Sequence, residues 1–101
     1  NHGIVYLLLG KYGRYYIGST TDLHRRLTQH NAGKVHSTMR MGLPMKLVCF
    51  KEFATIQEAR RIEYRLKDGR TLKKRVNIYK SLTQKEADRL NTRFSTGPIA
   101  Q

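Results

Sequence analysis

The chain of 101 residues contains one cysteine, two prolines, no tryptophan and only seven acidic residues. A single cysteine, Cys49, excludes an intramolecular disulfide and a zinc site built from several cysteines. It lies in the apolar run LVCF, so we expect a buried thiol. The longest purely apolar run, IVYLLL, is far shorter than a membrane span, and no secretory leader is recognisable. These features predict a reduced, cytoplasmic protein that does not enter membranes.

The seven acidic residues are far outnumbered by 20 lysines and arginines, and the net charge is therefore +13. Such a charge repels itself in a compact fold unless a polyanion is the usual partner. Nucleic acid is the leading candidate, and a merely soluble or ribosome-like basic surface is the alternative. A membrane surface is disfavoured, because no segment combines a basic face with a wide apolar one. The length fits one domain with a modest core.

Strand signals open the chain. GIVYLLL and RYYIG are rich in β-branched and aromatic residues, and the glycines of GKYG separate them, which predicts a hairpin. Side chains alternate between the two faces of a strand, so the length of the loop decides how Tyr6 and Tyr16 are related. An odd loop would place them on one face, and an even loop would separate them.

Helix signals follow the hairpin. Thr21 or Asp22 can cap a helix through TTDLHRRLTQHNAG, and Asn31 with Gly33 can end it. The run MKLVCFKEF, residues 45–53, is apolar enough to predict a third strand in a central position.

The rest of the chain favours helices. Thr55 and Glu58 form a capping box that predicts a helix over 56–67. Residues 70–82 are weakly helical, and a second capping box, Thr83 with Glu86, predicts a short helix over 84–93. We therefore expect a single α/β domain over 1–94, with a small three-stranded, mainly antiparallel sheet flanked by three to four helices, and a flexible tail over 95–101.

Polar residues occupy apolar stripes on two of these helices. At about 100° per residue, Leu23, Arg26, Leu27 and His30 share one face, whereas Arg25 points roughly opposite. On the later helix Glu63 takes a place in the stripe of Ala59, Ile62 and Leu66. A carboxylate there is costly unless a cation meets it, and Arg26, Lys67 or a metal ion are the candidates.

Each of these residues also has a structural interpretation. Glu63 can form an ion pair with Arg26, His30 can be a satisfied buried histidine, and Tyr6 and Tyr16 can be ordinary strand tyrosines. Their convergence in a basic domain favours phosphodiester hydrolysis. Arg26 suits a forked contact to phosphate, Glu63 can hold Mg²⁺ or Mn²⁺, and the tyrosines and His30 can handle protons.

These motifs, in the order GIVYLL, YYIGST, TTDLHRRLTQHNAGK and EARRIEYRLK, resemble the GIY-YIG nuclease superfamily. The resemblance covers about residues 3–67 and is greatest to small single-domain bacterial members related to the nuclease modules of excision-repair proteins and structure-selective endonucleases. It implies a DNA endonuclease with one divalent metal, Mg²⁺ or Mn²⁺, acting in repair or recombination.

Carried over by position, the resemblance assigns catalytic roles. Tyr6 is expected to be the general base or part of the water-activating network, and Tyr16 a phosphate or proton-network partner. Arg26 would stabilise the transition state, His30 matches a position occupied by His or Tyr in relatives, and Glu63 would bind the metal.

A further set of residues is expected to contact DNA, mostly through its phosphates. Gly18 would allow close backbone approach, and Asn77 could match a late family asparagine. A partner protein could supply targeting. The competing hypotheses are a catalytically weak or inactive nucleic-acid-binding module and an interaction domain that feeds substrate to a partner nuclease. The set comprises Gly18, Lys34, His36, Arg40, Lys67, Arg70, Lys73, Lys74 and Asn77.

Overall fold

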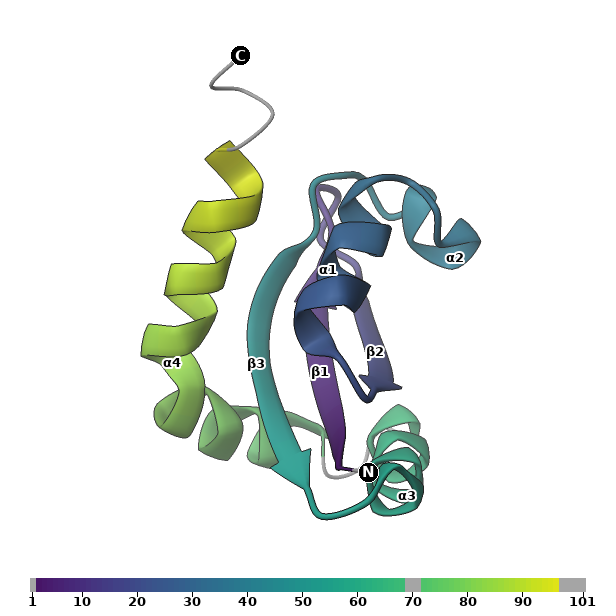
Figure 1. Ribbon diagram of the computed structural model, residues 1–101, viewed down its shortest axis with the longest axis vertical. Coiled ribbons are helices and arrows are strands. Elements are labelled where there is room, and N and C mark those ends of the chain that lie inside the picture. The colour runs from purple at the N-terminus through teal and green to yellow at the C-terminus, as the bar shows by residue number, and fades with distance from the viewer. Residues whose placement is uncertain (1, 69–71, 97–101) are drawn as a thin grey trace.

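The structure is a computed structural model that describes residues 2–68 and 72–96 (Figure 1). Three strands form one sheet, and helices lie against both of its faces and along one edge (Figure 1). Among the described residues, no helix is long and apolar enough to cross a bilayer. The elements are β1 (Gly3–Leu9), β2 (Tyr15–Thr20), α1 (Leu23–Asn31), α2 (His36–Met39), β3 (Lys46–Phe53), α3 (Ile56–Lys67) and α4 (Leu72–Thr96).

The sheet has the order β2-β1-β3, and both pairs are antiparallel. This confirms the predicted fold class. The expected central position of residues 45–53 is wrong, because β1 is central and β3 is an edge strand. The apolar character of β3 has another origin, since α4 packs against it and removes it from solvent.

The hairpin loop decides the relation of the two tyrosines. Strand β1 ends at Leu9 and β2 begins at Tyr15, so the loop is odd, and Tyr6 lies opposite Gly18 while Leu8 lies opposite Tyr16. Because opposite residues share a face, Tyr6 and Tyr16 point to the same side of the sheet. We call this side the Tyr6 face and the other side the Val5 face.

Each face has its own core. On the Tyr6 face, Leu23 and Leu27 of α1 pack against the even-numbered side chains of β1, whereas Ala59 and Leu66 of α3 are buried on the Val5 face. The buried side chains of both helices lie on the faces that the sequence spacing predicts. The predicted caps are confirmed as well, since Asp22 accepts from the backbone N–H of Arg25 and Thr55 accepts from that of Glu58.

One continuous helix, α4, occupies residues where two were expected. The second capping box is therefore wrong: Thr83 lies inside the helix, where its hydroxyl donates to the carbonyl of Tyr79 and accepts from the backbone N–H of Phe50. Tertiary contact with the edge of β3 takes the place of a helix cap. The tail expected from residue 95 begins within α4, and residues 97–101 lie outside the described residues.

The edge of β3 is covered by side chains of α4. The amide of Asn91 accepts from the N–H of Leu47 at 2.7 Å and donates to its carbonyl at 2.8 Å. With Thr83, it satisfies backbone groups that a further strand would otherwise pair with. The opposite edge of the sheet is formed by β2, which contributes Tyr16, Gly18 and Ser19 to the candidate site.

Candidate active site

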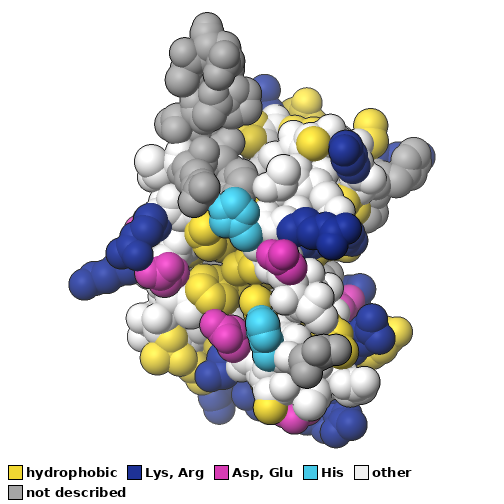
Figure 2. Space-filling model, viewed as in Figure 1, with side chains coloured by type: hydrophobic (Ala, Val, Ile, Leu, Met, Phe, Trp, Pro, Cys, Tyr) yellow, Lys and Arg dark blue, Asp and Glu magenta, His cyan; other side chains and the backbone are white. Residues whose placement is uncertain are grey.

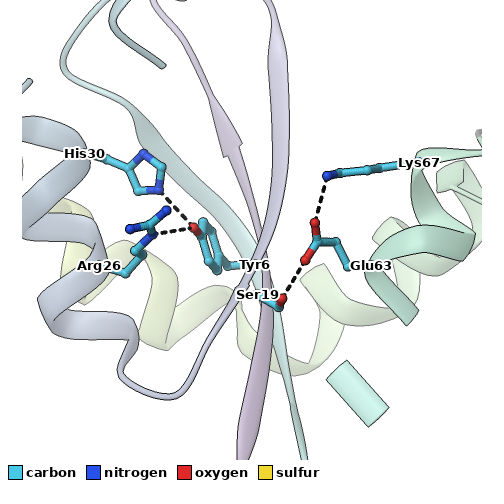
Figure 3. Close-up of polar contacts among 6 residues, drawn as sticks. All are labelled: Tyr6, Ser19, Arg26, His30, Glu63 and Lys67. Atoms are coloured by element: carbon cyan, nitrogen blue, oxygen red, sulfur yellow. Dashed lines mark hydrogen bonds and ion pairs between the residues drawn. The ribbon is translucent and has the colours of Figure 1, made fainter. Parts of the chain in front are cut away.

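Three predicted site residues meet at the hydroxyl of Tyr6 (Figure 3). Nε2 of His30 lies 2.9 Å from Oη of Tyr6, and Nε of Arg26 donates to the same oxygen at 3.4 Å. Tyr6 comes from the central strand, and the other two project from the inner face of α1. Tyr6 and His30 are almost completely buried, at 1% and 0% exposure, and Arg26 is half-buried.

A fourth residue, Thr38 of the short helix α2, completes a chain of hydrogen bonds. Its hydroxyl lies 2.9 Å from Nδ1 of His30 and donates to the carbonyl of Val35 at 3.1 Å. A proton on Nδ1 of His30 then gives every donor an acceptor, because Arg26 donates to Tyr6, Tyr6 to Nε2, Nδ1 to Thr38, and Thr38 to Val35. We assign this tautomer, which leaves Nε2 as the proton acceptor.

Burial sets the protonation states in this cluster. Burial raises the pKa of Tyr6 to about 12. The hydrogen bond from Arg26 acts in the opposite direction and lowers this pKa. Burial and then the positive charge of Arg26 lower the pKa of His30 to about 4. The bond to Tyr6 raises the pKa of Arg26. At neutral pH the cluster therefore holds a neutral tyrosine, a neutral imidazole and a guanidinium.

Tyr16 and Gly18 shape the space around Tyr6. The ring of Tyr16 lies edge-on to the ring of His30, and the two ring centroids are 5.1 Å apart. The centroid of the Tyr16 ring lies 6.3 Å from that of the Tyr6 ring. A methyl group at Gly18 would lie 2.5 Å from Oη of Tyr6. Gly18 was expected to admit DNA, but the close approach that the structure shows is by the side chain of Tyr6.

An open hollow of about 340 Å³ lies beside Arg26. The end of β2 and the first turns of α1 and α3 form it, and three arginines, Arg25, Arg26 and Arg60, line it with Ser19 and Gln29. Arg26 thus links the buried Tyr6 to solvent, while its Nη1 donates to Oε1 of Gln29 at 3.1 Å. A concave surface with three guanidinium groups is suited to phosphate.

Glu63 lies next to this hollow but outside the Tyr6 cluster. It accepts at Oε1 from the hydroxyl of Ser19, and Nζ of Lys67 pairs with its Oε2 at 2.7 Å. Of the three cations proposed for it, Lys67 is the one that the structure shows. Figure 3 shows a strand of the sheet running between this pair and the cluster of Tyr6, Arg26 and His30.

Glu63 is the carboxylate near the hollow that could hold a single divalent ion. The side chain is partly exposed, and the ammonium group of Lys67 already occupies the place of a cation at Oε2. Mg²⁺ and Mn²⁺ accept one protein carboxylate with water and phosphate oxygens in the other positions. No group of three His, Cys, Asp or Glu side chains able to hold a metal occurs in residues 2–68 and 72–96.

The order of these motifs has a counterpart among known proteins. The family model described as the GIY-YIG catalytic domain matches residues 2–77, which is most of the chain. The chain belongs to the GIY-YIG family. Membership in this nuclease family confirms the resemblance in the sequence.

Similar GIY-YIG chains carry the name UPF0213 protein. The chain is 38% identical over 88 residues to one from Bacillus pumilus (87% of this chain, 90% of the relative) and 33% identical over 87 residues to YazA of Bacillus subtilis (86% and 88%). It is 46% identical over 63 residues to one from Streptococcus pneumoniae, covering 62% of this chain and 64% of that relative. The match thus spans less than two thirds of this last protein.

A solved structure is similar as well. The solution NMR structure of the UPF0213 protein BH0048 from Bacillus halodurans shares 33% sequence identity with this GIY-YIG chain. The match covers 83% of this chain and 96% of that one, with a TM-score of 0.49.

The residues expected to contact DNA are scattered over the GIY-YIG domain. Lys34 and Arg40 are exposed near α2, and the side chains of Lys73, Lys74 and Asn77 are exposed on α4. Lys67 is engaged with Glu63. Arg70 lies outside the described residues; His36 begins α2, and its side chain is not among those described.

Several residues of the site escaped the sequence-based prediction. Thr38 and Ser19 carry hydroxyl groups that the chain offers in many places, and only the fold brings them to His30 and Glu63. Helical periodicity correctly separates Arg26 from the exposed Arg25. Periodicity within one helix does not reveal that the side chain of Arg25 also lines the hollow between α1 and α3, because α3 forms the other side of that hollow. Arg60 was missed for the same reason.

Proposed function

We propose that this GIY-YIG domain is a divalent-metal-dependent endonuclease that hydrolyses DNA phosphodiester bonds. One observation carries the proposal: Arg26 joins a buried, hydrogen-bonded Tyr6 and His30 to an open hollow that holds two further arginines. Glu63 borders this hollow through Ser19. The arrangement combines a phosphate-binding surface, a proton acceptor and a carboxylate for a cation.

Arg26 is the proposed contact to the phosphate that reacts. Its bonds to Tyr6 and Gln29 hold the guanidinium at the wall of the hollow. A preorganised cation there stabilises the charge that develops on the phosphorane oxygens without having to reorganise during the reaction. Arg25 and Arg60 are placed to bind neighbouring phosphates.

The chain of hydrogen bonds from Tyr6 to His30 is the proposed path for the proton of the attacking water. As the water oxygen bonds to phosphorus, the bond from phosphorus to the leaving oxygen breaks and that oxygen departs with the electron pair. The proton of the water passes to Oη of Tyr6 while Tyr6 gives its own to Nε2 of His30. A pKa of about 4 makes His30 a weak base in the protein alone. A bound phosphate offsets the charge of Arg26, which is one cause of the low pKa, and so favours the transfer.

Glu63 is the residue that would hold the metal ion. When bound, a divalent ion polarises a phosphoryl oxygen and stabilises the leaving alkoxide. Ser19 keeps the carboxylate oriented by its bond to Oε1, and Lys67 pairs with Oε2.

A net charge of +13 supports a nucleic-acid substrate, and DNA rather than RNA is proposed from the family resemblance. A role in repair or recombination, with a partner protein for targeting, is proposed on the same ground. On the face that carries α1, Lys and Arg side chains lie mostly toward the outline (Figure 2).

Cleavage of duplex, branched and single-stranded DNA with Mg²⁺ or Mn²⁺ tests the proposal. Arg26→Ala and Glu63→Ala should each lower the rate by about 100-fold or more, as the loss of a preorganised charge does. Arg89→Ala is the matched control, because Arg89 is exposed on α4 and pairs with Glu86. Equal cleavage by the Arg26 or Glu63 variant and the wild type would show that the assignment is wrong.

A second candidate is a nucleic-acid-binding module without activity. It is favoured by one observation: both oxygens of Glu63 are engaged by Ser19 and Lys67. Calorimetric titration with Mn²⁺ separates the two. Binding of DNA without Mn²⁺ binding or cleavage would favour the module, and Mn²⁺ binding that Glu63→Ala abolishes would favour the nuclease.

A further inference from the structure

An exposed aromatic ring stands on the Val5 face, opposite the Tyr6 cluster. Tyr15 begins β2 and is 56% exposed, whereas its neighbour Tyr16 points to the Tyr6 face. Consecutive strand residues point to opposite sides, so the two tyrosines mark two surfaces that meet at the edge of β2. The ring of Tyr16 packs against the rings of His30 and Tyr6. No part of the proposed reaction uses Tyr15.

Tyr15 lines a continuous series of hollows, which we call the Tyr15 groove. One of about 350 Å³ lies between the sheet and α4, and the next, of about 160 Å³, follows α4 toward the start of β3. A third, of about 290 Å³, reaches around the edge of β2. All three share Tyr15, which makes its ring the centre of the groove.

The groove is apolar at its floor and basic at its rim. Leu7 and Val48 of the sheet form the floor beneath Tyr15. The exposed lysines at the rim are Lys73 and Lys80 of α4, with Lys46 beside the second hollow and Lys67 beside the third. Asp88 is the acidic residue at the groove and lies at its far end.

This composition matches single-stranded nucleic acid. A flat aromatic ring among lysines offers a stacking surface for a base and cations for the phosphates on either side. A duplex does not offer its bases in this way, because each is already stacked between its neighbours. An acidic protein would use the lysines but would gain nothing specific from an exposed ring above an apolar floor.

The groove also leads toward the proposed site. The hollow at the edge of β2 is lined by Tyr15, Tyr16 and Lys67. Tyr16 touches the cluster around His30, and Lys67 pairs with Glu63. A strand that leaves the Tyr15 groove over this edge arrives beside the residues proposed for catalysis.

We propose that the Tyr15 groove binds an unpaired stretch of the DNA substrate, with one base stacked on the ring of Tyr15 and the adjoining phosphates on Lys73 and Lys80. The inference rests on the proposed function, because it assumes a DNA substrate and assigns the unpaired part of that DNA to this groove. Binding and cleavage are separate measurements, so either can fail alone.

Fluorescence anisotropy with a labelled single-stranded oligonucleotide of deoxythymidine, in EDTA, measures binding without cleavage. Tyr15→Ala should weaken binding by about 5- to 150-fold, which is the value of one aromatic stack. Tyr15→Trp should retain it. Tyr12→Ala is the matched control, because Tyr12 is 73% exposed in the hairpin loop but does not line the groove.

A pair of double variants tests the lysines. Lys73→Gln with Lys80→Gln should lower the affinity and reduce the slope of log K against log salt by about 1.4, for two phosphates lost. Arg75→Gln with Lys85→Gln removes the same charge from exposed positions of α4 outside the groove and should change the slope less.

Two outcomes would overturn the inference. One is an unchanged affinity of Tyr15→Ala for the single strand, with folding verified by circular dichroism. The other is an equal loss of affinity for a blunt duplex, which would show that Tyr15 does not contact an unpaired base. Absence of cleavage by the wild type would refute the proposed function and would leave the result on binding intact.

Discussion

The hydroxyl of Tyr6 lies 2.9 Å from Nε2 of His30, although 24 positions separate the two residues. Both side chains are buried, and each is the partner that makes the burial of the other tolerable. Arg26 donates to the same hydroxyl, so the interior cluster is joined to the surface by one charged side chain. Four predictions follow from the contacts around this cluster and around Glu63.

Thr38 should be a positioning residue for His30. Thr38→Val removes the acceptor for Nδ1–H, which should lower stability by about 1–3 kcal/mol and mix the tautomers of the imidazole. Thr38→Ser keeps the hydroxyl and should restore both. Nitrogen chemical shifts of His30 report the tautomer directly, and unchanged shifts in Thr38→Val would contradict the assignment.

His30 should make folding stability depend on acid pH. Its pKa is about 4 in the folded protein against an ordinary value of about 6.5, so the unfolded chain binds the proton first. Its contribution, at most about 3 kcal/mol, is full above pH 6.5 and is lost as the pH falls toward 4. Urea unfolding of the wild type and of His30→Gln across this range measures the difference. His24→Gln, at an exposed position of α1, is the control, and parallel curves for wild type and His30→Gln would refute the low pKa.

Lys67 should compete with a metal ion for Glu63. Lys67→Met removes the ammonium group from Oε2 and should tighten Mn²⁺ binding by about 2- to 5-fold, in keeping with the small value of a half-exposed ion pair. Glu63→Gln should abolish the binding. Calorimetry on the protein alone measures both, with Lys85→Met as the control for loss of charge. Weaker binding by Lys67→Met would show that Lys67 assists the site.

Gly18 should be required for the position of Tyr6. Gly18→Ala places a methyl group against Oη of Tyr6, which should cost about 1–3 kcal/mol and displace the hydroxyl from His30 and Arg26. The proposed nuclease activity should fall with it. Gly13→Ala is the control: its φ of +86° gives a backbone cost of about 1–2 kcal/mol, but nothing lies near its Cβ, so activity should persist. Full activity in Gly18→Ala would contradict this view of the glycine.

Much of the fold was predictable because local chemistry decides it. The alternation of the first two strands, the caps at Asp22 and Thr55 and the apolar stripes of α1 and α3 all depend on residues close together in the chain. The errors concern long-range contacts. Thr83 has the local signature of a cap, yet its hydroxyl meets the backbone of Phe50, and the packing of α4 along β3 overrides the local signal.

The candidate site divides in the same way. By itself the sequence determined that Arg26, His30 and Glu63 lie on the buried faces of their helices, because the spacing along a helix decides its faces. It also determined the net positive charge, because the charge depends only on residue type. Only the tertiary structure decided which atoms meet. It placed Thr38 behind His30, Lys67 on Glu63 and Tyr15 in a basic groove, because such contacts depend on how separate elements pack and on the odd length of one hairpin loop.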